Sequence, residues 1–128
     1  MRLDGLRVLL VDDEADARRV LVRVLQDAGA IVTAAASAGE AIEALPTARP
    51  EVLVSDQGMP DVDGFDLIRK VRAGGHNAKE LPAVALTAFV HKNDQRQALL
   101  AGFQVHVPKP VDPHDLTVVI ASLAGRTG

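Results

Sequence analysis

The chain has 128 residues and a formal net charge of −3, and aromatic residues make up only 2% of it. A chain of this length can bury a core as one domain without disulfides, and it has no cysteine to form one. Few aromatic rings and no excess of positive charge argue against binding to nucleic acid or to an anionic membrane. No signal peptide or membrane-spanning run is evident, so the sequence predicts one cytoplasmic domain, 1–128, with its core at about 6–124.

Short apolar runs alternate with amphipathic stretches along the chain. The runs predict strands at 6–11, 31–35, 51–56, 82–87 and 103–107. Helical spacing of apolar residues predicts helices at about 17–28, 38–45, 65–71, 94–100 and 113–123. Continuous apolar strands separated by helices indicate a parallel sheet covered on both faces. Five such units predict a flavodoxin-like, doubly wound α/β fold, (βα)5, with strand order 2-1-3-4-5.

Several residues mark where these helices begin. Ser37 and Glu40 form a capping box before the second helix. Asp112 followed by Pro113 is typical of the start of a helix, and here it opens the last one. In the first helix, Arg18, Arg19 and Arg23 lie between the apolar positions, which predicts a solvent-facing side.

Polar residues follow four of the five predicted strands. Asp12 and Asp13 follow the first strand, Asp56 ends the third, Thr87 ends the fourth and Lys109 follows the fifth. In a doubly wound sheet the carboxyl ends of the strands form the ligand site, so we expect these side chains to converge. Three carboxylates repel one another unless a cation relieves them, and all-oxygen ligands favour Mg²⁺.

Together, these groups match the needs of phosphoryl chemistry. A metal ion and an ammonium group can hold the charge of phosphoryl oxygens, and a carboxylate can itself accept the phosphoryl group. Taken singly, an aspartate after a strand is often a turn residue, and a lone lysine or threonine is often only a surface group. Their joint placement at the ends of successive strands is what favours a functional site.

In this arrangement the sequence resembles the receiver domain of two-component response regulators over about residues 6–124. It also resembles the receivers found at the C-terminal end of hybrid histidine kinases, through residues 101–113. The motifs that carry the resemblance are Val11-Asp12-Asp13-Glu14, Ser55-Asp56-Gln57-Gly58-Met59-Pro60, Asp63-Gly64, Leu86-Thr87-Ala88 and Lys109-Pro110.

The resemblance implies a role for each site residue. Asp56 would be the phosphoacceptor, and Asp12, Asp13, Asp56 and the backbone carbonyl of Gly58 would hold Mg²⁺. Thr87 would bond a phosphoryl oxygen, and Lys109, before a cis peptide bond to Pro110, would contact it electrostatically. The only catalysis implied is of the domain's own phosphorylation and dephosphorylation.

The resemblance also implies partners. A histidine kinase or a phosphotransfer domain would donate the phosphoryl group. The face made by the fourth helix, the fifth strand and the fifth helix would then change its affinity for a downstream protein. No membrane or nucleic-acid partner is expected, and the domain would act either alone or as part of a longer chain.

His106 departs from the family pattern, which usually has Tyr or Phe at this position as a ring that moves inward on activation. One interpretation is a half-exposed strand residue without a role. The other is a switch residue whose charge changes near neutral pH. Because an apolar pocket disfavours a protonated ring, we expect inward rotation of His106 to be favoured at high pH.

Three other functions remain open at this point. A metal-dependent aspartyl phosphatase of small phosphoesters would need Asp-x-Asp after the first strand, but Glu14 stands two residues after Asp12. A flavodoxin-like cofactor binder would need stacking Tyr or Trp, and both are absent. A pseudo-receiver that binds partners without phosphorylation is disfavoured by the complete set of site residues.

Overall fold

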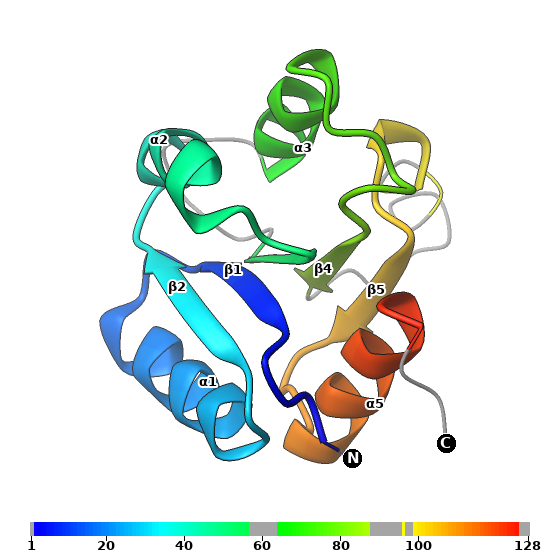
Figure 1. Ribbon diagram of the computed structural model, residues 1–128. Helices are drawn as coiled ribbons and strands as arrows, with labels where there is room; N and C mark the ends of the chain where they lie inside the picture. Colours follow the sequence, from blue (N-terminus) through cyan, green and yellow to red (C-terminus); the bar gives the residue numbers. More distant parts are fainter. Residues whose placement is uncertain (1, 57–63, 88–95, 97–98, 126–128) are drawn as a thin grey trace.

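The computed structural model describes residues 2–56, 64–87, 96 and 99–125 (Figure 1). Strands and helices alternate along the chain as expected, and residues 99–101, between the last two strands, are also helical. In chain order the elements are β1 Arg7–Val11, α1 Ala15–Asp27, β2 Ile31–Ala35, α2 Ala38–Ala48, β3 Val52–Asp56, α3 Gly64–Ala73, β4 Ala83–Thr87, β5 Val105–Pro108 and α5 Pro113–Leu123.

The five strands form one parallel sheet in the order β2-β1-β3-β4-β5. Every residue of β3 and of β4 is buried, as expected for strands covered on both faces. Figure 1 shows α2 and α3 over one face of the sheet and α1 and α5 over the other. The predicted flavodoxin-like α/β fold and its strand order are therefore confirmed.

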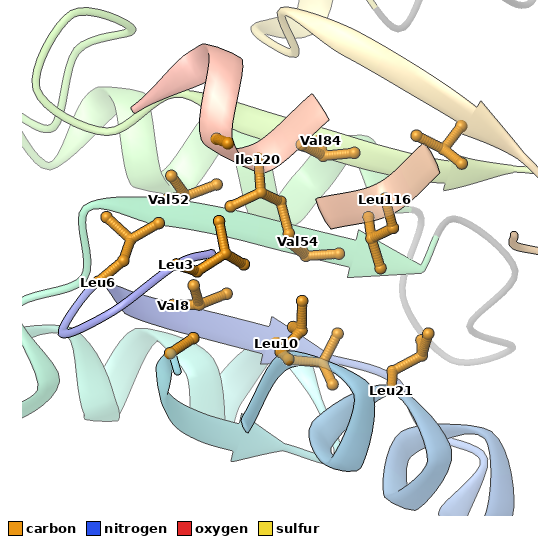
Figure 2. Close-up of a cluster of buried hydrophobic side chains, with 14 of the residues drawn as sticks. Leu3, Leu6, Val8, Leu10, Leu21, Val52, Val54, Val84, Leu116 and Ile120 are labelled. Carbon is orange, nitrogen blue, oxygen red and sulfur yellow. The ribbon is translucent and has the colours of Figure 1, made fainter. Parts of the chain in front are cut away.

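Two apolar clusters fill the space between the sheet and the helices. Successive residues of a strand point to opposite faces, so Leu9 joins one cluster and Leu10 the other. The first cluster includes Leu67 and Ile68 of α3. The second lies against α1 and α5 (Figure 2), and its members include Leu3, Leu6, Val8, Leu21, Val52, Val54, Val84, Leu116 and Ile120.

The segment before β1 belongs to this second cluster. Leu3 is completely buried, although it precedes the expected start of the core near residue 6. Backbone hydrogen bonds fix the segment against the end of α1: the Leu3 amide donates to the Ala28 carbonyl, and the Gly5 amide donates to the Gly29 carbonyl. The first residues therefore close one end of the core.

The expected capping contacts are present, and several element bounds differ from expectation by one to three residues. The Ser37 side chain accepts from the Glu40 amide, and Asp112 accepts from the Asp115 amide. Helix α2 runs to Ala48 rather than to about 45, because the turn around Pro46 is held by the buried Leu45. Strand β5 begins at 105 rather than 103. Within the described residues, no helix is long and apolar enough to cross a membrane.

Candidate functional site

The carboxyl ends of β1 and β3 lie side by side at one edge of the sheet. Val11 pairs with Ser55 in the sheet register, so Asp12 and Asp56 follow neighbouring positions. Asp12, Asp13 and Asp56 each offer a carboxylate oxygen, and these atoms all lie within 4.8 Å of one another. The structure thus brings together the three carboxylates predicted from the sequence, which we call the acid cluster.

Lys109 reaches the acid cluster from the other side of β4. Its ammonium group donates to Asp56 Oδ1 over 2.5 Å. The Asp56 side chain is only 6% exposed whereas that of Lys109 is 37% exposed, so the pair joins a buried anion to a solvent-accessible cation. The Lys109 amide donates to the Thr87 carbonyl, and the Lys109–Pro110 peptide bond is cis, as the resemblance implied.

Asp12 is held within the acid cluster by burial and by a backbone hydrogen bond. It is buried, and its Oδ1 accepts from the Glu14 amide over 2.9 Å. Burial raises the pKa of the Asp12 carboxyl, and the negative charge of Asp56 adds to this. The hydrogen bond from Glu14 and the charge of Lys109 oppose the rise. Holding the ionised form of Asp12 therefore costs free energy that a bound cation would offset.

The donor set of the acid cluster fits a hard divalent cation. All three groups are carboxylates, which are the oxygen ligands that Mg²⁺ prefers. Asp13 is exposed, whereas Asp12 and Asp56 are buried. A cation held here would keep part of its water shell, as Mg²⁺ requires.

An open hollow of about 310 Å³ lies beside the acid cluster, between α1 and the segment that follows β5. Its polar side is formed by Asp12, Glu14 and Lys109. The rest is mostly apolar and includes Val20, which is 60% exposed. The apolar lining residues are Ala17, Val20, Leu21, Leu86, Pro110 and Val111.

The other predicted site residues lie in different places. Thr87 is buried at the end of β4, next to Lys109 through the backbone hydrogen bond already described. Gly58 lies outside the described residues. His106 is half-buried in β5 and lines a separate hollow with His114, so it is not part of the acid cluster.

Arg18 has a role that the sequence pattern did not reveal. It was expected on the solvent-facing side of the first helix, but it is half-buried and its guanidinium donates to the Asp12 carbonyl over 2.8 Å. The contact joins the first turn of α1 to the backbone of the acid cluster.

Comparison with known proteins agrees with this site. Residues 8–121 match the family described as the response regulator receiver domain. The chain belongs to the response regulator receiver family.

Individual relatives of this receiver domain vary in length. An uncharacterized 14.6 kDa protein of Leptolyngbya boryana is 47% identical over 109 residues, which are 85% of this chain and 82% of that protein. The response regulator Rre1 of Synechocystis is 35% identical over 96% of this chain and 53% of its own length. The sensor protein TorS of Escherichia coli is 33% identical over 94% of this chain, which spans only 13% of TorS.

Solved structures show the same fold. The chemotaxis protein CheY4 of Vibrio cholerae superimposes with a TM-score of 0.86 at 30% identity, covering 93% of this chain and 98% of that one. The receiver domain of the Francisella response regulator 1452 gives a TM-score of 0.86 at 25% identity, covering 97% of this chain and all of the other.

Proposed function

We propose that this receiver domain is a phosphorylation-activated signalling switch, in which Asp56 accepts a phosphoryl group from a phosphohistidine. The observation that carries the proposal is the pairing of Asp56 with Lys109 beside two further carboxylates. The donor would be a histidine kinase or a phosphotransfer domain. A cytoplasmic location follows, because phosphohistidine is made there from ATP.

The transfer exchanges one bond for another. An oxygen of Asp56 forms a bond to phosphorus while the bond between phosphorus and the donor's imidazole nitrogen breaks. The imidazole leaves with the electron pair and takes up a proton from water. The buried carboxylate of Asp56 is held facing Lys109, so the ammonium group is already within reach of the incoming phosphoryl oxygens.

Mg²⁺ held by Asp12, Asp13 and Asp56 would neutralise charge on the phosphoryl oxygens. We assign two further roles from family resemblance: the Gly58 backbone carbonyl as an additional metal ligand and the Thr87 hydroxyl as a donor to the phosphoryl group. The chain thus acts on its own Asp56, and we propose no turnover of an external metabolite.

The hollow beside the acid cluster suits a donor protein. Its apolar wall, with the exposed Val20 on α1, offers a surface next to the acceptor carboxylate. A helix that presents a phosphohistidine could place apolar side chains there while its phosphoryl group meets Asp56. We further propose that phosphorylation changes the face formed by the fourth helix expected at about 94–100, β5 and α5. His106 is the candidate switch residue on this face.

A nuclear magnetic resonance titration tests this proposal. Beryllofluoride with Mg²⁺ mimics a phosphoryl group on a carboxylate, and we expect saturable shifts at Thr87, Lys109 and His106. The Asp56→Asn variant is the control and should show none of them. Shifts at Thr87 and Lys109 without any change at His106, at two pH values, would remove His106 from the switch. Unchanged spectra of the wild type would contradict the whole proposal.

A further inference from the structure

Arg72, in the last turn of α3, forms a hydrogen-bond network at the edge of the sheet opposite the acid cluster. Its guanidinium donates to the carbonyls of His76, Leu81 and Gly102 and to the side-chain oxygen of Gln104. The shortest of these distances are 2.6 Å to Leu81 and 2.7 Å to Gly102. Within the described parts of the chain, no carboxylate pairs with Arg72. Arg72 therefore donates to neutral oxygens, most of them backbone carbonyls, rather than to a carboxylate.

The partners of Arg72 stand just before two neighbouring strands. Leu81 lies two residues before β4, and Gly102 lies three residues before β5. Because the guanidinium is planar and rigid, its two sides hold both strand entries at a fixed distance from each other. Gln104 strengthens the link: its side-chain oxygen accepts from the Ala83 amide, and its side-chain nitrogen Nε2 donates to the Gly102 carbonyl.

Gly102 allows this close approach. Its φ of +129° is a conformation that residues with a side chain rarely adopt. A Cβ atom at this position would lie 3.2 Å from Cγ and from Nε of Arg72. The glycine thus makes room for the stem of the arginine as well as for the turn.

The register of β5 on β4 depends on contacts outside the strand itself. It has four residues and, among the described strands, pairs only with β4. Pro108 has no amide hydrogen to donate, and at this end of the ladder the Thr87 carbonyl accepts from the Lys109 amide instead. Lys109 follows directly after Pro108, and a shift of β5 along β4 would carry its ammonium group away from Asp56.

We propose that Arg72 is a positioning residue for Lys109: by clamping the entries of β4 and β5 together, it sets the register that places Lys109 against Asp56. The clamp itself is independent of phosphorylation. Its consequence for phosphoryl transfer rests on the function proposed above.

Amide hydrogen exchange of the protein without metal or phosphoryl donor tests the clamp directly. In Arg72→Met, we expect the amides of Gln104 and Lys109 to lose about tenfold more protection than the Ile31 amide, which donates to the Leu6 carbonyl on the β2 side of the sheet, away from Arg72. Equal loss at all three amides would indicate a general effect on stability and would overturn the proposal.

Two further variants sharpen this test. Arg72→Lys keeps the charge, but a single ammonium group cannot bridge both strand entries. We therefore expect it to restore little of the lost protection. Full protection in Arg72→Lys would overturn the role given to the guanidinium group. Arg69→Met is the matched control, because Arg69 is exposed on the same helix and, among the described residues, its guanidinium contacts only Asp66 and the Phe65 ring. It should leave all three amides unchanged.

Phosphorylation rates then connect the clamp to function. With acetyl phosphate and Mg²⁺, at a temperature where each variant is folded, we expect Arg72→Met to be phosphorylated at least about fivefold more slowly than Arg69→Met. Selective loss of protection with an unchanged rate would overturn the positioning of Lys109. A wild type that takes no phosphoryl group, but shows selective loss of protection in Arg72→Met, would refute the proposed function and leave the clamp standing.

Discussion

Lys109 and Asp56 are 53 residues apart in the chain, yet the ammonium group of one donates directly to the carboxylate of the other. They meet because β3 and β5 lie on either side of β4, and each residue stands at the carboxyl end of its strand. Because β4 lies between β3 and β5, it sets how far apart the carboxyl ends of those two strands are.

Removing the ammonium group of Lys109 should change Mg²⁺ affinity and the rate of phosphorylation in opposite directions. In Lys109→Met, the acid cluster loses its nearest cation, so we expect Mg²⁺ to bind about tenfold more tightly. Phosphorylation of Asp56 should nevertheless become slower, because the phosphoryl oxygens lose a charge partner. Calorimetric titration with Mg²⁺ and phosphorylation kinetics check the two effects. Lys70→Met, at an exposed position of α3, is the control. Weaker Mg²⁺ binding in Lys109→Met would contradict this account of the site.

The raised pKa of Asp12 predicts a pH dependence of stability. Its folded-state pKa lies above the unfolded value, so ionisation of Asp12 costs stability as the pH rises through the folded pKa. In the metal-free protein at neutral pH, we expect Asp12→Asn to raise the free energy of unfolding, because the buried charge is removed. The gain should disappear below the unfolded pKa, where Asp12 is protonated in both states.

Urea unfolding in the presence of a chelator, between pH 3 and pH 7, measures this difference. Asp16→Asn is a matched control, because Asp16 is an exposed carboxylate in the first turn of α1. The same variant of Asp12 should bind Mg²⁺ more weakly. A loss of stability in metal-free Asp12→Asn at pH 7 would show that the ionised Asp12 carboxylate does not destabilise the folded protein.

The burial of Leu3 predicts that the residues before β1 contribute to stability. Leu3 is enclosed in the cluster between the sheet, α1 and α5 (Figure 2), so Leu3→Ala should lower the free energy of unfolding by about 2–5 kcal/mol. Ile31→Ala, at a position that is 58% exposed, should cost less than about 1 kcal/mol. Denaturant unfolding of both variants measures the contrast. Equal effects would mean that the first residues do not pack as described.

The strands and the acid cluster were predictable because both depend on local patterns. Continuous apolar runs such as Val52–Val54 indicate buried strands, and a polar residue at the end of such a run lies at the ligand edge of the sheet. The ends of helices with a strong cap, such as Ser37, could also be placed.

Other features depend on contacts that no local pattern contains. Arg18 was expected on the solvent-facing side of the first helix, and no pattern singled out Arg72. The guanidinium groups of both nevertheless donate to backbone carbonyls outside their helix. Leu3 stands alone before the first apolar run, so nothing nearby indicates its burial. The end of α2 beyond Pro46 is decided by packing of Leu45 in the core, which outweighs the usual effect of proline on a helix.

The most direct test of the proposed switch is the intact mass of the protein after incubation with acetyl phosphate and Mg²⁺. The wild type should gain a single base-labile phosphoryl group. The Asp56→Asn variant should gain none, and neither should the wild type with Mg²⁺ removed by a chelator. A wild type that gains no phosphoryl group, or an Asp56→Asn variant that gains one equally well, would contradict the assignment of Asp56 as the phosphoacceptor.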